Sequence, residues 1–144
     1  MSVGKICTRT VATAVPSETV LEVARRMGEF NVGTLVVVEE GPLPVGFITD
    51  RDIVLRCVAR DMAPAETQIS EIMTRGVRTV YESTPIEEAL RTMAGAAMRR
   101  LVVTGDGGAL VGLLSLDDVL ELLTEEAAAV GQLLRKEAPE MVSR

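Results

Sequence analysis

The sequence contains no histidine and no tryptophan, and it has only two phenylalanines and one tyrosine among its 144 residues. Without histidine, the chain lacks the usual general base at neutral pH, the Ser-His and Cys-His nucleophile pairs and His-ligated zinc. Because aromatic side chains are scarce, any buried core must be aliphatic. The composition of 47% apolar and 25% charged residues is typical of a globular protein, but an enzyme is disfavoured.

Cysteine is also scarce, and the 21 acidic residues outnumber the 15 basic ones. Neither Cys7 nor Cys57 belongs to a Cys-x-x-Cys pair, so a zinc or redox site is disfavoured. The net charge of −6 disfavours a surface that tracks nucleic-acid phosphates. No apolar run approaches the ~20 residues of a membrane-spanning helix, and the N-terminus is too charged for a signal peptide. We therefore expect a cytoplasmic protein without a nucleic-acid or membrane partner.

An internal repeat is the most informative feature that is present. When the sequence is shifted by 66 residues, positions 3–56 align with positions 69–122 without a gap. The matched positions include identical residues such as Thr8 and Thr74, Thr13 and Thr79, Met27 and Met93, Gly46 and Gly112, and Asp52 and Asp118. Two copies of a long unit indicate a duplicated domain rather than a solenoid, which needs three or more short repeats.

The duplication divides the chain into four parts. We expect repeat 1 over residues 1–61, a polar linker over 62–68, repeat 2 over 69–125 and a C-terminal helical extension over 126–144. In each repeat, apolar residues at helical spacing follow a short extended piece, and β-branched runs separated by a glycine-containing turn come next. A second helix closes each copy. The predicted order is therefore β-α-β-β-α, twice.

The hairpin strands determine how the two copies are expected to pack. The runs Thr34–Val38 and Leu101–Thr104 are apolar on both faces, so both faces are expected to be buried. About 60 residues are too few to cover such a sheet alone. We therefore predict an α/β fold in which the two repeats pack sheet to sheet around a pseudo-two-fold axis. The clefts between the repeats are the candidate ligand sites.

Both copies carry one short motif where the second hairpin strand meets the following helix. It has the form Gly-x-x-[Thr/Ser]-x-x-Asp, with Thr49 and Asp52 in repeat 1 and Ser115 and Asp118 in repeat 2. A hydroxyl followed by an acid three residues later is close to a capping box, so helix capping is one role. The same helix start offers N–H groups and a partial positive charge to a phosphate. The aspartate can also accept hydrogen bonds from ribose hydroxyls.

The duplicated β-α-β-β-α unit with this motif resembles a pair of CBS domains, a family named after cystathionine β-synthase. The resemblance covers about residues 3–125. Such pairs commonly bind adenosine nucleotides such as AMP or ATP in the clefts between repeats, and they act as energy or ligand sensors. The stretches 99–103 and 112–118 are similar to a nucleotide site in the regulatory gamma subunit of AMP-activated protein kinase. The resemblance implies an adenosine nucleotide as ligand and no catalytic cofactor.

The resemblance also implies roles for individual residues. It implies a phosphate contact for Arg100, a contact between the Ser115 hydroxyl and phosphate, and ribose binding by Asp118. In repeat 1 it implies the corresponding roles for Thr49 and Asp52.

Sites of this family also use the first strand of the opposite repeat. This places the segment 7–13 near Asp118 and the segment 73–79 near the corresponding aspartate of repeat 1. Thr13 and Thr79 fall in these segments and are candidate ligand contacts, and the alternative for both is an ordinary strand residue.

The two copies differ where charge matters. Arg51 lies inside the motif of repeat 1, whereas repeat 2 has Asp117 there and carries Arg99 and Arg100 before its strand. Each cleft is thus expected to keep one arginine that faces a phosphate, and the alternative for each arginine is a solvated surface charge. Asp117 disfavours a highly charged nucleotide in its own cleft.

No aromatic side chain is placed to stack an adenine. The base is therefore expected between aliphatic side chains and read by backbone groups. The candidates, for most of which the alternative is plain core, are Val11, Val32, Leu35, Ile48, Val77, Met98, Leu101 and Leu114.

The C-terminal segment exceeds what a CBS pair needs. Its apolar residues follow a spacing close to a heptad seam, at Leu116, Leu120, Leu123, Ala127, Val130 and Leu134. The spacing predicts a long helix that ends at Pro139 and either lies on its own module or meets another subunit. CBS pairs usually associate as disc-like dimers, so the resemblance implies a homodimer.

Two functional hypotheses from different classes follow. The first is a non-catalytic regulatory module that binds an AMP-, ADP- or ATP-like nucleotide in its clefts, and an unidentified downstream protein senses the change in packing. The alternative is a structural or protein-interaction module that dimerises with empty clefts, the motif serving only as a helix cap. A small enzyme built on the acidic pairs 50/52 or 117/118 is disfavoured, because a nucleophile and histidine are missing.

Overall fold

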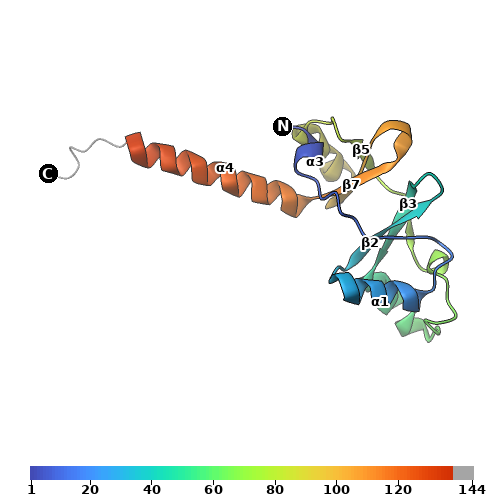
Figure 1. Cartoon of the computed structure of the whole chain (residues 1–144). Helices are drawn as coiled ribbons and strands as arrows, with labels where there is room; N and C mark the ends of the chain where they lie inside the picture. Colours follow the sequence, from blue (N-terminus) through green and yellow to red (C-terminus); the bar gives the residue numbers. More distant parts are fainter. Residues whose placement is uncertain (138–144) are drawn as a thin grey trace.

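The structure is a computed structural model that describes residues 1–137, and it contains two sheets flanked by helices (Figure 1). Repeat 1 contributes, in chain order, β1 (Thr13–Ala14), α1 (Val20–Phe30), β2 (Thr34–Glu39), β3 (Leu43–Thr49) and α2 (Asp50–Arg56). Repeat 2 contributes β5 (Thr79–Tyr81), α3 (Ile86–Ala96), β6 (Arg100–Thr104), β7 (Leu110–Ser115) and α4 (Leu116–Glu137). The predicted β-α-β-β-α order is thus confirmed in both repeats.

The first helix of each repeat buries the apolar face that its sequence spacing predicts. In α1, the side chains of Val20, Val23 and Met27 are buried. Thr19 caps the helix start, because its Oγ1 accepts a hydrogen bond from the Glu22 N–H at 3.1 Å. The helix α3 buries the corresponding face in repeat 2.

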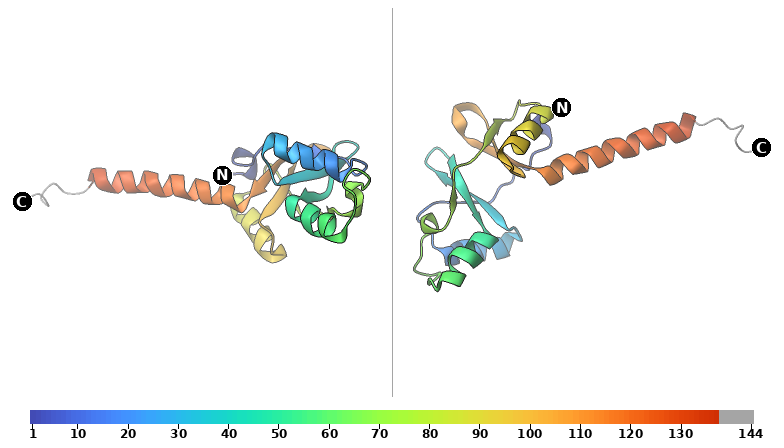
Figure 2. Two further views of the ribbon diagram at one scale, coloured as in Figure 1. Left: turned by 90° about the horizontal axis from the view of Figure 1, so that it is seen from below. Right: turned by 180° about the vertical axis from the view of Figure 1, so that it is seen from behind.

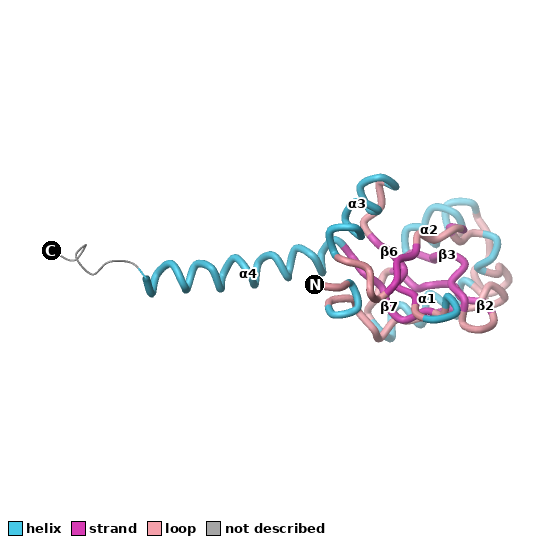
Figure 3. The backbone as a smooth tube through the Cα atoms, turned by 90° about the horizontal axis from the view of Figure 1, so that it is seen from above, coloured by secondary structure: helices cyan, strands magenta, loops and turns pink. Residues whose placement is uncertain are grey.

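The two hairpins lie at the centre of the body that the two repeats form, where the repeats meet (Figure 3). Val36, Val38 and Phe47 of the first hairpin form a buried cluster with Val102 of the second. The opposite faces of the same strands supply one further core inside each repeat. Both faces of the hairpins are therefore buried, and the predicted sheet-to-sheet packing is confirmed.

The first segment of each repeat packs on the other repeat. Val3, in the short 3-10 helix Val3–Lys5, is fully buried in the core of repeat 2. Ile69 is its counterpart in the duplication, and it is fully buried in the core of repeat 1. Each core thus lacks a side chain unless the other repeat supplies it. The unit that folds is therefore the pair rather than either repeat alone.

The same exchange extends to the sheets. The two sheets have the strand orders β1-β2-β3-β4 and β5-β6-β7. The strand β4 (Thr74–Arg75) comes from repeat 2 but pairs antiparallel with β3 of repeat 1. In repeat 2 the corresponding contact is an antiparallel bridge between Thr8 and Leu113. The residue pattern did not predict these crossings, since the segments are short and carry no alternating apolar residues. The family resemblance did place segments 7–13 and 73–79 beside the motifs of the opposite repeats.

The helix α4 runs away from the body of the molecule, as Figures 1 and 2 show. Its first turns pack on repeat 2 through Leu116, Val119 and Leu122. Its other large apolar side chains are exposed, namely Leu120, Leu123, Val130, Leu133 and Leu134. The alternative in which the helix lies on its own module is therefore wrong for this part of the chain. Pro139 lies outside the described residues.

Candidate functional site

Both Gly-x-x-[Thr/Ser]-x-x-Asp motifs cap the helix that follows them. Thr49 Oγ1 accepts a hydrogen bond from the Asp52 N–H at 3.0 Å, and the Asp52 carboxylate accepts one from the Thr49 N–H at 3.1 Å. Ser115 and Asp118 make the same two hydrogen bonds, at 3.1 and 2.9 Å. The predicted capping role is confirmed, and the reciprocal bonds hold each aspartate in one orientation at its helix start.

The glycine of each motif lies where the segment from the opposite repeat crosses the hairpin. A Cβ atom on Gly46 would lie 2.3 Å from the backbone oxygen of Thr74, and one on Gly112 would lie 2.7 Å from that of Thr8. Only a residue without a side chain lets the two backbones approach this closely. The crossing places Thr74 and Thr8 beside the two motifs.

Asp52 is buried, with 8% of the residue exposed, and other protein groups already bind its carboxylate. Thr74 Oγ1 lies 3.4 Å from each carboxylate oxygen, and Arg56 Nε lies 3.8 Å from Oδ1. The Arg56 guanidinium also donates to the carbonyl oxygens of Ile72 and Met73. Asp52 thus joins the two repeats, and a ribose at this carboxylate would have to displace Thr74.

Asp118 occupies the same motif position in repeat 2 but lines a cleft. Within residues 1–137, its only side-chain hydrogen bond runs from the Ser115 N–H to Oδ2 at 2.9 Å. The position that corresponds to Arg56 is occupied by Leu122, which packs against the core. Oδ1 of Asp118 is therefore available to accept hydrogen bonds from a ligand.

The cleft beside Asp118 lies between the repeats and consists of two adjoining hollows of about 220 and 500 Å³. Both hollows are lined by Val32, Thr34, Arg100 and Leu113. We call them together the Asp118 cleft. The cleft brings seven of the predicted residues together, namely Val11, Val32, Thr49, Arg51, Arg100, Ser115 and Asp118.

The placement of the arginines differs from the expected one. Arg51 at the start of α2 and Arg100 at the start of β6 line the same hollow, so the expectation of one such arginine in each cleft is wrong. The packing of the two hairpins brings these two starts to the same side of the interface. Arg99 instead lies 3.6 Å from Asp117 in an exposed ion pair, which offsets part of the negative charge of Asp117.

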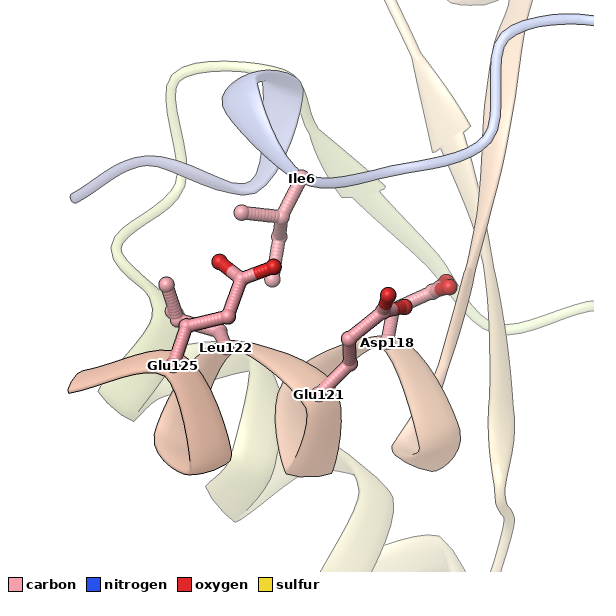
Figure 4. Close-up of a pocket in the computed structure, with 5 residues that line it drawn as sticks. All are labelled: Ile6, Asp118, Glu121, Leu122 and Glu125. Carbon is pink, nitrogen blue, oxygen red and sulfur yellow. The ribbon is translucent and has the colours of Figure 1, made fainter. Parts of the chain in front are cut away.

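An acidic groove lies on the other side of Asp118, between α4 and the N-terminal segment (Figure 4). It is lined by the carboxylates of Asp118, Glu121 and Glu125 together with Ile6 and Leu122. The Asp118 carboxylate thus has an acidic surface on one side and the two arginines of the cleft on the other. The cleft side of Asp118 is therefore more favourable for an anion than the groove side.

A second cleft is lined by residues of repeat 2 alone, namely Thr74, Arg75, Gly76, Val77, Arg78, Ala96 and Met98. It contains the predicted residue Val77 and the base-contact candidate Met98. Thr74, which lines this cleft, donates its hydroxyl to the Asp52 carboxylate. The second cleft therefore keeps cationic and apolar side chains, while its aspartate is engaged by the protein.

Other predicted residues lie in strands or in the core. Thr13 lies in β1 opposite Val36, and Thr79 lies in β5 opposite Val102. Neither threonine is among the residues that line the two clefts. Four of the candidates for contact with the base are fully buried core residues, namely Leu35, Ile48, Leu101 and Leu114.

Cys7 lies beside the crossing near Asp118, and both cysteines are free thiols. Burial raises the pKa of the Cys7 thiol, the positive charge of Arg9 opposes this change, and the Asp118 carboxylate reinforces it. Cys7 is therefore a protonated thiol at neutral pH. Among residues 1–137, no group of three or more His, Cys, Asp or Glu side chains could hold a metal ion. The same part of the chain has no helix with the length and apolar character that crossing a membrane requires.

Comparison with known proteins identifies the family. The family model for the CBS domain matches residues 3–58 and again residues 69–125. The chain therefore belongs to the CBS-domain family and contains a pair of its domains. It is 38% identical over 118 residues to the CBS domain-containing protein YhcV of Bacillus subtilis, and the match covers 82% of each chain. CBS pairs of this kind are regulatory modules.

Two solved structures are similar over most of their length. A protein with CBS domains from Burkholderia ambifaria matches with a TM-score of 0.73 and 32% identity, covering 85% of this chain and 93% of that chain. The CBS domain pair of protein MJ0100 matches with a TM-score of 0.74 and 27% identity, covering 88% and 98%. That pair was solved in complex with 5′-methylthioadenosine and S-adenosyl-L-methionine.

Proposed function

We propose that this protein is a regulatory module that binds an adenosine nucleotide in the Asp118 cleft. The observation that carries the proposal is Asp118, which lines a cleft that Arg51 and Arg100 also line and whose carboxylate keeps one oxygen without a protein hydrogen bond in residues 1–137. The similarity to the MJ0100 pair, which holds two adenosine-containing ligands, supports the same ligand class.

The lining of the cleft suggests one orientation of the nucleotide. The ribose hydroxyls donate to Asp118, and the adenine lies against aliphatic side chains such as Val11 and Val32. The phosphate points away from the acidic groove and toward Arg51 and Arg100. One phosphate suits this site better than three, since Asp117 also lines the cleft.

The nucleotide would act as a signal because it contacts both repeats at once. Val11 and Val32 belong to repeat 1, whereas Arg100 and Asp118 belong to repeat 2. A ligand shifts the relative packing of the repeats only as far as its affinities for the two arrangements differ. Asp118 lies in the first turn of α4, so a shift at the cleft is passed to this helix. A downstream protein, or a second copy in a homodimer, would sense the change.

Isothermal titration calorimetry with AMP, ATP, 5′-methylthioadenosine and S-adenosylmethionine tests the proposal. Asp118→Asn should weaken binding about 10- to 100-fold, the effect of losing hydrogen bonds to a charged group. Asp52→Asn is the matched control at the same motif position, and it should change the affinity less than about threefold. Arg100→Gln should weaken AMP binding but not the binding of 5′-methylthioadenosine, which lacks a phosphate.

Two results would contradict this assignment. If Asp52→Asn weakens binding and Asp118→Asn does not, the nucleotide occupies the second cleft instead. If no adenosine compound binds or raises the melting temperature, the nucleotide function is wrong, because a ligand selective for the folded state must stabilise it. The module would then be structural, and the capping bonds alone would account for the motif.

A further inference from the structure

The outer part of α4 is an apolar helix that the described part of its own chain does not cover. Leu123, Val130 and Leu134 are 53–64% exposed. Figure 2 shows this part of the helix running away from both repeats. Helices without tertiary contacts are marginally stable in water, and most helical stability comes from burial of an apolar face. The outer part of α4 therefore fits a helix that is completed by a partner.

The charges along α4 indicate what this partner is. The first half of the helix carries Asp117, Asp118, Glu121, Glu125 and Glu126. The second half carries Arg135, Lys136 and Glu137. Two copies in parallel would place the acidic halves side by side, whereas antiparallel copies place each acidic half beside a basic end. The opposed helix dipoles favour the same direction.

The apolar seam has a centre that suits the antiparallel arrangement. Leu120 and Leu134 lie seven residues before and after Ala127, while Leu123 and Val130 lie four before and three after. In an antiparallel pair that crosses at Ala127, Leu120 therefore lies opposite Leu134, and Leu123 lies within one residue of the level of Val130. The small side chain of Ala127 lets the two helices approach closely at the crossing.

One ion pair follows from the same register. Arg135 comes 18 residues after Asp117, which is about five turns of α-helix, so the two side chains lie on one edge of α4. Residues on the same edge of two antiparallel helices face each other. Asp117 lies ten residues before Ala127 and Arg135 eight residues after it, so Asp117 of one copy is only about 3 Å along the helix axis from Arg135 of the other. The symmetry makes this contact twice. In a parallel pair the same two positions would be about 27 Å apart.

We propose that α4 pairs antiparallel with α4 of a second copy, with the seam buried between them and Asp117 of each beside Arg135 of the other. The pairing requires no nucleotide, so the full chain is tested without ligand, and the outcome is independent of the proposed nucleotide site.

The first experiment is sedimentation equilibrium of the full chain. The protein should be a dimer, and Leu123→Glu with Leu134→Glu should raise the dissociation constant about 100-fold or more, because apolar burial is replaced by charge. Val54→Glu with Val58→Glu is the control. Val54 and Val58 lie in and just after α2 and are 55% and 58% exposed, and the change should have less than about a threefold effect. A monomeric wild type, or a dimer that only the control disrupts, would overturn the proposal.

A charge-reversal cycle tests the direction of pairing. Asp117→Lys and Arg135→Glu should each raise the dissociation constant about three- to tenfold, the usual range for exposed ion pairs made twice. The double variant should return to within about twofold of the wild type, because each lysine then faces a glutamate. Additive weakening in the double variant would exclude the antiparallel register. Circular dichroism of each variant verifies that the repeats remain folded.

Discussion

Repeat 1 and repeat 2 share one fold and one motif, yet the motif aspartates have different surroundings. In repeat 1, Thr74 and Arg56 bind the Asp52 carboxylate and hold the two repeats together. In repeat 2, Leu122 stands where repeat 1 has Arg56, and Asp118 lines a cleft. The capping bonds are the same in both copies, so capping alone does not determine whether an aspartate is available to a ligand.

After a duplication, the same motif residue can thus be structural in one copy and available for binding in the other. The Arg56 guanidinium reaches the backbone of the segment that crosses from repeat 2, and this contact closes the site around Asp52. In repeat 2 the position of Arg56 is occupied by Leu122, which packs against the core, and Asp118 lines the cleft. Both repeats thus exchange their first segments, but the side chains that contact the motif aspartate differ between them.

The largest expected effect concerns the exchanged core residues. Ile69→Ala should lower the free energy of unfolding by about 4 kcal/mol and Val3→Ala by about 2 kcal/mol, because each leaves a cavity in a fully buried site. Urea unfolding gives these values. Amide hydrogen exchange then tests whether the two segments are swapped between the repeats. Ile69→Ala should lower the protection of the amides of α1 first, and Val3→Ala should lower that of α3. Loosening of each variant's own repeat instead would show that the segments are not exchanged.

The next effect concerns the crossing of backbones at the motif glycines. Gly46→Ala should cost about 3 kcal/mol and Gly112→Ala about 2 kcal/mol, because the added Cβ overlaps a backbone oxygen that cannot move freely. Gly28→Ala in α1 is the control, since a Cβ there meets nothing within 4 Å. It should stabilise the protein by about 0.5–1 kcal/mol through helix propensity. Equal changes for all three variants in thermal or urea unfolding would contradict the close crossing.

The smallest effect separates the two aspartates in stability rather than in binding. Asp118→Ala should cost about 1 kcal/mol, because it removes one side-chain partner of a helix cap. Asp52→Ala should cost about 2 kcal/mol, since it removes the same cap and also leaves Thr74 without its partner. Urea unfolding of the ligand-free variants measures both values. A larger loss for Asp118→Ala would reverse the assignment of the structural and binding roles.

The fold could largely be predicted because its signals are local or repeated. The apolar spacing of residues such as Val20 and Met27 depends on neighbours within a few turns, and the capping box at Thr49 spans four residues. The gapless alignment of the two copies then extends each local prediction to the other repeat. The sheet-to-sheet packing follows because strands that are apolar on both faces must be covered twice.

The candidate site could be predicted only in part. Ser115 and Asp118 belong to a recognisable motif, and the structure places both in the cleft that Arg100 also lines. The placement of Arg51 in the same cleft was missed, because it depends on how the start of α2 and the start of β6 meet across the interface between the repeats. The close crossing at Gly46 had a signal in the motif itself, since an identical glycine recurs in the second copy.

The sequence by itself determined the duplicated α/β architecture, the helix caps and the apolar seam of α4, because each of these depends on spacing along the chain. Only the tertiary structure decided that Asp52 is enclosed and Asp118 faces a cleft. That difference depends on Thr74 and Arg56, and Thr74 belongs to a segment 22 residues further along the chain that crosses from the other repeat. The availability of a carboxylate is set by what packs against it, and distant parts of the chain supply those contacts.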